Sequence, residues 1–154
     1  MRDNRCEPAT IIHTVGYEKS ELDDYVKRLQ ETGIELLVDV RERPQSRKRG
    51  FSKNKLREAV EAVGIEYRHV HQLGDPKPGR EAARAGDHAL FVEIFSAHME
   101  LPETKEATAD LASEISGRRI CLTCFERDHS GCHRTIVAEH LANLLDAEIL
   151  HIKV

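Results

Sequence analysis

Short apolar segments alternate with amphipathic segments along almost the whole chain, and this alternation limits the possible folds more than any other feature. Strands that are apolar on both faces and are separated by helices are typical of a mostly parallel sheet covered by helices. We therefore expect an α/β fold with three layers, α/β/α, and about five strands, similar to a Rossmann fold. The expected strands are residues 10–18, 34–42, 65–73, 118–126 and 147–154.

Helical periodicity fills most of the segments between these strands. Ser20, with Asp23 three residues later, is expected to cap the first helix, and Gly33 is expected to end it. A stretch rich in glycine and proline at residues 74–86 is expected to form a long loop, which makes it a candidate lid over a site. Four other helices are expected. The first begins at Phe51-Ser52, the second spans residues 87–99, the third runs from Pro102 to about Ile115, and the fourth follows Gly131.

The length of 154 residues fits a single domain. We expect residues 11–154 to form that domain and residues 1–10, which include Cys6, to be a disordered or loosely attached tail. The N-terminus has no apolar signal region, and no segment approaches the ~18 consecutive apolar residues of a membrane span. These features favour a cytoplasmic protein without membrane contacts. In that compartment the cysteines would be core, metal or catalytic groups rather than disulfides.

Unusual polar residues occur where several of the expected strands end. Tyr17 and Glu18 follow the first strand, Asp39 and Arg41 lie on the second, His71 lies late in the third, and Cys124 and Glu126 lie on the fourth. In parallel sheets, ligands bind outside the carboxyl ends of the strands, near the point where the strand order reverses. We therefore expect these side chains to line one crevice.

Three of the four cysteines fall within twelve residues of one another. Alternate side chains of a strand face opposite sides, so Cys121 and Cys124 should point to different faces, with Cys121 in the core. Cys132 is expected near the N-terminus of the last helix. Free N–H groups and the helix dipole at that position, together with His133 and Arg134, favour a thiolate or a bound anion.

Three interpretations of this cluster stay open. In the first, Cys132 or Cys124 is a catalytic nucleophile, and Glu126 or His133 is the general acid or base. In the second, Cys124, Cys132 and His133 bind zinc or iron, although the C-x2-C-x7-C-H spacing matches a normal zinc site only weakly. In the third, buried thiols pack a loop while Arg134 binds backbone carbonyls.

A basic segment, residues 41–57, contains eight Lys or Arg and one Glu in a chain of net charge −4. One basic segment in an acidic protein favours a local anion site over a DNA-coating surface. Arg41, which is nearest to the second strand, is the first expected anion contact. The other expected anion contacts are Arg134, Tyr17 and Ser46. Asp39 lies in an apolar strand, so its carboxylate needs a partner, either Arg41 or a backbone amide.

Four blocks of the sequence together resemble domain-of-unknown-function family 488. The blocks are TVGYEKS, LLVDVRERPQSR, GIEYRHVHQLG and CLTCFERDHSGCHRTIVAEHL, and the similarity extends from Ile11 to Val154. The resemblance implies an α/β fold and a shared site without a settled reaction. The positions that it implies for the site are Gly16, Tyr17, Asp39, Arg41, Pro44, Ser46, Cys124, Glu126, Cys132, His133 and Arg134, of which Gly16, Asp39 and Pro44 are expected to give structural support.

The leading hypothesis is a cysteine-dependent hydrolase or transferase that acts on an anionic, phosphate-containing substrate. It requires no cofactor, and its partner is a small anionic ligand or a nucleic-acid phosphate. One alternative is an anion- or nucleic-acid-binding module without catalysis, whose binding would weaken with salt. The other alternative is the zinc or iron site. The sequence leaves the substrate and the oligomeric state open.

Overall fold

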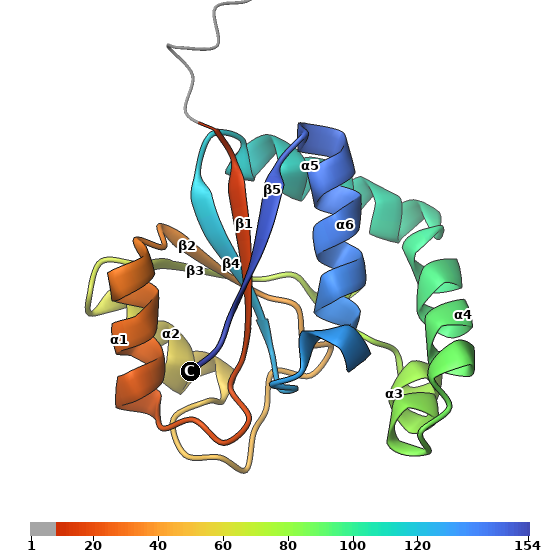
Figure 1. Cartoon of the computed structure of the whole chain (residues 1–154), viewed down its shortest axis with the longest axis horizontal. Coiled ribbons are helices and arrows are strands. Elements are labelled where there is room, and N and C mark those ends of the chain that lie inside the picture. Colours follow the sequence, from red (N-terminus) through yellow and green to blue (C-terminus); the bar gives the residue numbers. More distant parts are fainter. Residues whose placement is uncertain (1–8) are drawn as a thin grey trace, which may run out of the picture.

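The computed structural model describes residues 9–154 and has the expected α/β architecture (Figure 1). Five strands form one sheet in the order β3-β2-β4-β1-β5, and every pairing between neighbouring strands is parallel. The strands are β1 (Ile11–Gly16), β2 (Leu36–Asp39), β3 (Glu66–His69), β4 (Arg119–Cys124) and β5 (Glu148–Ile152). The prediction of a loose tail over residues 1–10 lies, except for its last two residues, outside the described part, as does Cys6.

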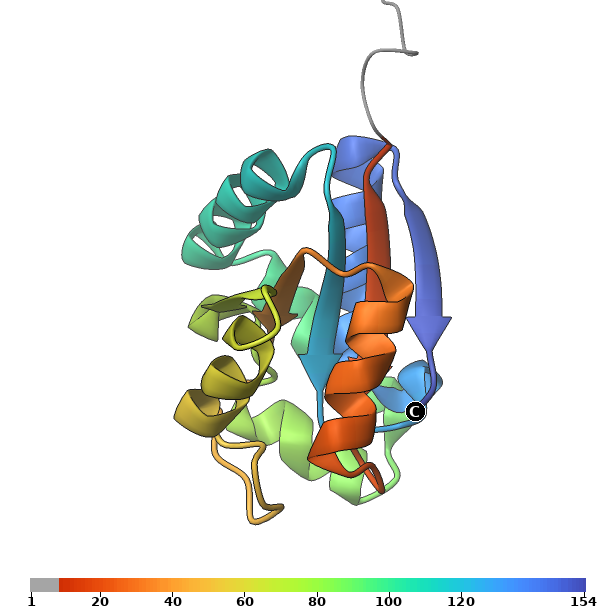
Figure 2. The same ribbon diagram turned by 90° about the vertical axis from the view of Figure 1, so that its left-hand side faces the viewer.

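Helices cover both faces of the sheet and form the outer layers. Side chains of α1 and α2 pack on one face, and side chains of α3 to α6 pack on the other. Figure 2 shows the orange α1 in front of the sheet and the blue α6 behind it. The helices are α1 (Leu22–Thr32), α2 (Lys53–Glu61), α3 (Lys77–Arg84), α4 (His88–Met99), α5 (Pro102–Ile115) and α6 (His133–Leu145). None of the helices in residues 9–154 combines the length and the apolar character needed to cross a bilayer.

The strands are apolar on both faces because each face has its own helical layer. In β2, Leu36 and Val38 belong to the core beneath α3 to α6, whereas Leu37 between them belongs to the core beneath α1 and α2. The same alternation separates Cys121 from Cys124 in β4, as the strand period predicts. Cys121 is fully buried, so the prediction that it is a core residue is confirmed.

Residues 74–86 do not form the long loop that the sequence predicts. Most of this stretch is helix α3, with Pro76 at its N-cap and Pro78 in its first turn. Proline is compatible with the first turn of a helix, where no backbone donor is lost. Ala82 is buried against the sheet layer, which anchors the helix. The two prolines therefore mark the start of a helix, and the expectation of a long loop is wrong.

The start of α1 also differs by one residue from the expected position. Glu21 is the N-cap residue, and its side chain makes no capping hydrogen bond, while Ser20 is buried just before it. The expected end is correct, because Gly33 adopts a left-handed conformation (φ 77°) that terminates the helix.

The order of the strands places a crevice at the carboxyl end of β4. This strand lies between β2 and β1, whereas a dinucleotide-binding sheet has β2 beside β1. The chain leaves β1 and β2 toward α1 and α2 on one face, but it leaves β4 toward α6 on the other. Loops that diverge to opposite faces leave a gap between them, and this gap is where such sheets bind ligands.

Gly16, at the end of β1, allows the loop that follows β4 to approach closely. Gly16 lies beside Cys124 in the sheet, and a Cβ atom added to it would lie 1.6 Å from the carbonyl oxygen of Glu126. This oxygen belongs to the backbone, so it cannot move aside as a flexible side chain would. A side chain at position 16 would therefore displace the segment that carries Glu126.

We expect Gly16→Ala to lower the free energy of unfolding by about 1–3 kcal/mol, the usual cost of forcing extra atoms into a packed site. Gly131→Ala is the matched control, because nothing lies within 4 Å of a Cβ at Gly131. Urea denaturation of both variants measures the difference. Equal stabilities of the two variants would show that the close approach at Gly16 does not constrain the fold.

Candidate functional site

A cavity of about 870 Å³ lies at the carboxyl ends of the strands. Segments distant in the sequence meet there because the backbone amides of Tyr17 and Val40 donate to the carbonyls of Cys124 and Thr123, at 3.1 Å in each case. These bonds tie the loops after β1 and β2 to the end of β4. Among the residues that line the cavity are Tyr17, Arg41, Ser46, Cys124, Glu126 and His133.

The side chains of Cys124 and Cys132 point toward each other. Cys124 ends β4, Cys132 is the N-cap residue of α6, and their sulfur atoms are in direct contact. Their Cα atoms are 8.0 Å apart, a wider spacing than the ~4.4–6.8 Å that a disulfide usually spans. Both residues are almost fully buried. The structure pairs the two sulfur atoms as a disulfide, but the backbone spacing is wider than that of a relaxed crosslink, which favours the reduced dithiol form.

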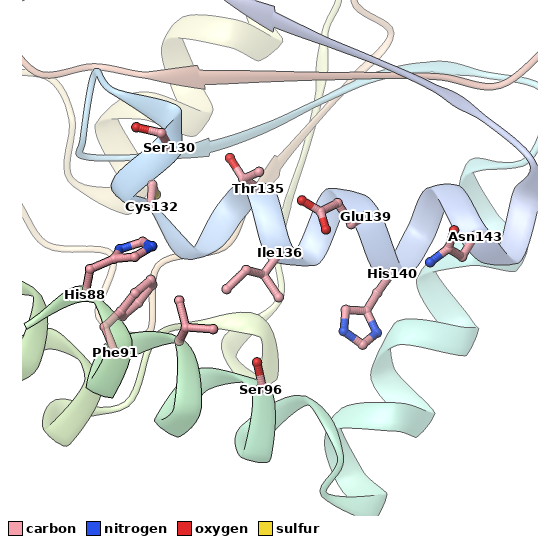
Figure 3. Close-up of a pocket in the computed structure, with 11 residues that line it drawn as sticks. His88, Phe91, Ser96, Ser130, Cys132, Thr135, Ile136, Glu139, His140 and Asn143 are labelled. Atoms are coloured by element: carbon pink, nitrogen blue, oxygen red, sulfur yellow. The ribbon is translucent and has the colours of Figure 1, made fainter.

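Each thiol borders a different cavity. Cys124 lines the larger cavity at the strand ends. Cys132 lines a smaller cavity of about 420 Å³ between α4 and α6. Figure 3 shows Cys132 at one end of this smaller cavity, near His88 and Phe91 of α4. A ligand in the larger cavity would consequently meet the sulfur of Cys124.

Arg134, which is only 1% exposed, reaches the sulfur of Cys124 with its guanidinium from the first turn of α6. Its Nη1 donates to the sulfur of Cys124 at 3.2 Å and to the carbonyl of Glu126, and its Nη2 donates to the carbonyl of Arg127 at 3.3 Å. Within residues 9–154 it forms no ion pair with a carboxylate. Burial lowers its pKa, since the charged form is desolvated. Arg134 is thus a buried cation whose one ionisable hydrogen-bond acceptor is sulfur.

The carboxyl group of Glu126 lies between the two thiols. Its Oε2 is 3.4 Å from the sulfur of Cys124 and 3.4 Å from the sulfur of Cys132. Burial raises the pKa of Glu126, and the charge of Arg134 opposes this shift only in part. Glu126 therefore keeps its proton to a higher pH than an exposed glutamate does.

An unprotonated ring nitrogen of His133 faces the sulfur of Cys132. Its Nε2 lies 2.6 Å from the carbonyl of Val40, and because a carbonyl can only accept, Nε2 carries the proton. Nδ1 is then unprotonated and lies 3.8 Å from the sulfur of Cys132. Burial lowers the pKa of His133 to about 4, so the ring is neutral near pH 7. A neutral imidazole in this tautomer can accept a proton from a thiol or bind a metal ion.

Cys124, Cys132 and His133 also form a possible set of metal ligands. One donor atom from each lies within 4.8 Å of the other two. Two thiolates and one imidazole are ligands that zinc prefers, and a hydrogen bond from the second ring nitrogen to a carbonyl is a usual way to orient a ligating histidine. The donor set therefore fits zinc or iron chemically.

Arg41 directs every nitrogen of its guanidinium at the protein. Nε and Nη2 donate to the two carboxylate oxygens of Asp39 at 2.8 and 2.7 Å, and Nη1 donates to the carbonyl of Phe51 at 2.6 Å and to Tyr17 at 3.2 Å. Asp39 thus has the partner that the sequence predicts. Burial lowers the pKa of Arg41, but the hydrogen bonds to Asp39 outweigh this effect and raise it. The contacts show a residue that anchors the basic loop, and an anion contact of Arg41 stays a prediction.

Other predicted residues shape the same loop. The ring of Tyr17 is buried and stacks on Phe51 with centroids 4.6 Å apart. The hydroxyl of Ser46 accepts from the backbone of Lys48 at 3.0 Å, and the carbonyl of Pro44 accepts from the backbone of Lys53 at 2.8 Å. The anion-binding roles of Tyr17 and Ser46 stay predictions, because these contacts explain the shape of the loop without a ligand.

Sequence reasoning missed the contribution of α3 and of the residues before it. Asp75, Arg80 and Arg84 line the larger cavity beside Arg43 and Arg47. The spacing of Arg80 and Arg84, four residues apart, could have indicated a helix with one cationic face. That signal was hidden because the surrounding glycine and proline residues predict a loop.

A family model described as "Domain of unknown function DUF488" matches residues 21–141, which is most of the chain. The matched region begins just before α1 and ends within α6, so it includes β2, β4 and both thiols of the site. Gly16 and Tyr17 lie just outside it. No curated protein matches the chain.

We expect Asp39→Asn to lower the free energy of unfolding by about 3 kcal/mol, because it leaves the buried charge of Arg41 without a counterion. Glu100→Gln is the control: Glu100 pairs with Lys105 at 3.3 Å, but both side chains are well exposed, so little change is expected. Thermal or urea denaturation compares the two. A loss at Asp39 no larger than at Glu100 would contradict the structural role of the pair.

Proposed function

Since the chain belongs to the DUF488 family, whose description names no reaction, we propose a function from the site itself. The protein is an enzyme that acts on an anionic, phosphate-containing substrate with the thiolate of Cys124 as its nucleophile. Glu126 is the general acid and base, and the arginines of the larger cavity bind the anion.

The contact between Arg134 and Cys124 is the observation that carries this proposal. A buried guanidinium is costly unless an anion compensates it. Its Nη1 and Nη2 donors reach two neutral carbonyls and the sulfur of Cys124, the latter at 3.2 Å. A thiolate at Cys124 supplies the missing negative charge, and a cation beside a cysteine is the usual means of making a thiol reactive.

The second thiol and the imidazole support this arrangement. The sulfur of Cys132 accepts from the backbone N–H of Arg134 at 3.5 Å and so caps α6. His133 is held by the carbonyl of Val40 at 2.6 Å, which fixes the start of the same helix against β2. Both contacts hold Arg134 in place, so we assign Cys132 and His133 to positioning and Cys124 to the chemical step.

The chemical step follows from the neighbours of Cys124. The thiolate attacks the phosphorus atom, an S–P bond forms, and the bond from phosphorus to the leaving oxygen breaks. Glu126, whose Oε2 lies 3.4 Å from the sulfur, gives its proton to the leaving oxygen. Water or another hydroxyl then attacks phosphorus, Glu126 takes up the proton of this nucleophile, and the thiolate leaves. Water makes the enzyme a hydrolase, and another acceptor makes it a transferase.

Cationic side chains at the cavity support an anionic substrate. Arg43, Arg47 and Arg84 line the cavity, are exposed, and form no ion pair within residues 9–154. Guanidinium groups bind phosphate through paired hydrogen bonds. The cavity volume of about 870 Å³ lies in the range of small-molecule sites, which favours a small phosphate ester over a long nucleic acid.

Thiol alkylation tests this function without a known substrate. We expect iodoacetamide to label Cys124 at least ~10-fold faster than Cys121 near pH 7, because burial raises the pKa of Cys121. Sulfate should slow the labelling of Cys124, and Arg43→Ser with Arg47→Ser should weaken that protection. Peptide mass spectrometry assigns the rates. Equally slow labelling of all thiols would rule out the thiolate mechanism.

A metal centre is a second candidate, which the short separations between Cys124, Cys132 and His133 favour. The two functions exclude each other at Cys124, because a thiolate that binds a metal ion is not a free nucleophile. In this alternative, the ion would polarise a substrate oxygen or a water molecule, with Glu126 beside it as the proton carrier.

We expect protein purified without chelators to contain no stoichiometric zinc or iron, as the thiolate mechanism requires. Elemental analysis by mass spectrometry measures this content, with Cys124→Ser as the control for non-specific metal. About one equivalent of metal that is absent from Cys124→Ser would instead establish the metal centre and remove Cys124 as the nucleophile.

A further inference from the structure

Asp75 is an acidic residue in a cavity that is otherwise suited to an anion. It lies between β3 and α3, lines the larger cavity together with Cys124 and Glu126, and is only 6% exposed. Its Oδ1 is buried and has no hydrogen-bond partner in the described part of the chain. A buried carboxylate oxygen without a partner is costly, so this position needs an explanation.

The neighbours of Asp75 hold its carboxyl group in place without neutralising it. A Cβ atom at Gly79 of α3 would lie 2.0 Å from Oδ1, so the absence of a side chain at Gly79 makes room for the carboxyl group. Arg80 donates to the carboxylate of Glu42 at 2.5 Å and to the backbone carbonyl of Asp75 at 2.8 Å. Arg80, the cation that acts on Asp75, is therefore already paired with another carboxylate.

The charged groups around Asp75 act in opposite directions. Burial and the negative charge of Glu126, on the loop after β4, raise the pKa of Asp75 to about 7, Arg80 opposes the shift, and Glu42 adds to it. The other charged or titratable side chains that line the cavity are Tyr17, Arg41, Arg43, Arg47, Arg84, Cys124 and His133. Asp75 is thus neutral in weak acid and ionised above neutral pH.

We propose that Asp75 recognises the anionic group of the substrate as a neutral carboxylic acid, which donates a hydrogen bond to the anion and repels it once ionised. The inference rests on the proposed function and names a further binding residue in the same cavity. A neutral acid supplies a donor that complements the arginines, whereas an ionised Asp75 adds a negative charge beside Glu126. Anion binding therefore weakens as the pH rises through the pKa of Asp75.

Calorimetric titration with sulfate tests the proposal, because sulfate keeps the same charge across this pH range and phosphate does not. We expect the wild-type protein to bind sulfate about 10-fold more tightly at pH 6 than at pH 8.5, as one ionising group of this pKa allows. Asp75→Asn keeps a donor and is neutral at every pH. It should bind at pH 8.5 about as tightly as the wild type does at pH 6.

Two further variants make the result specific. Glu81→Gln changes an exposed acid on α3 in the same way and should leave the pH dependence of the wild type intact. Gly79→Ala retains the Asp75 carboxyl group but forces it to move, and should weaken sulfate binding at pH 6. Denaturation curves confirm that each variant is folded.

The outcomes separate this proposal from the one on which it rests. Unchanged pH dependence in Asp75→Asn, or weaker sulfate binding by this variant at both pH values, overturns the role of Asp75. If Cys124 is still alkylated rapidly and sulfate still slows that reaction, the proposed function survives. Slow alkylation of Cys124, whatever sulfate does, overturns the proposed function.

Discussion

A buried positive charge that has no carboxylate partner within residues 9–154 organises the candidate site. Arg134 enters the core from the first turn of α6 and donates to the backbone on either side of Glu126 and to the sulfur of Cys124. These bonds fold the loop after β4 back onto the helix and bring the two thiols together. The shape of the loop and the electrostatic character of the thiol pair thus have the same origin.

The contrast with Arg41 shows why the position of this charge matters. Both guanidinium groups are buried at the carboxyl ends of neighbouring strands, but Arg41 is held by both carboxylate oxygens of Asp39. The opposite charges of this pair compensate each other, and the pair anchors the basic loop. The guanidinium of Arg134 donates to a sulfur atom, whereas that of Arg41 donates to a carboxylate. We infer that the protein uses the first arginine for stability and the second for reactivity.

Sequence periodicity was sufficient to predict the layers of the fold, the strands and the crevice, because apolar strands with helical crossovers allow few other arrangements. It also predicted Cys121 in the core and the pairing of Asp39 with Arg41. Sequence periodicity failed to predict α3. Its prolines fit the first turn of a helix, but prolines in a short stretch of sequence usually indicate a loop. Asp75 was missed with it: its environment depends on Gly79 and Glu126, whose proximity only the tertiary structure creates.

The most direct test of the account is the thiolate absorbance of the folded protein, measured in the ultraviolet as the pH is lowered from about 9 to about 5. Subtracting the curve of Cys124→Ser isolates the signal of one sulfur. If Arg134 stabilises the thiolate of Cys124, the difference corresponds to one thiolate near neutral pH that is lost only in acid. A difference that vanishes below pH 8 would show that Cys124 is an ordinary buried thiol and that the charge of Arg134 is compensated in another way.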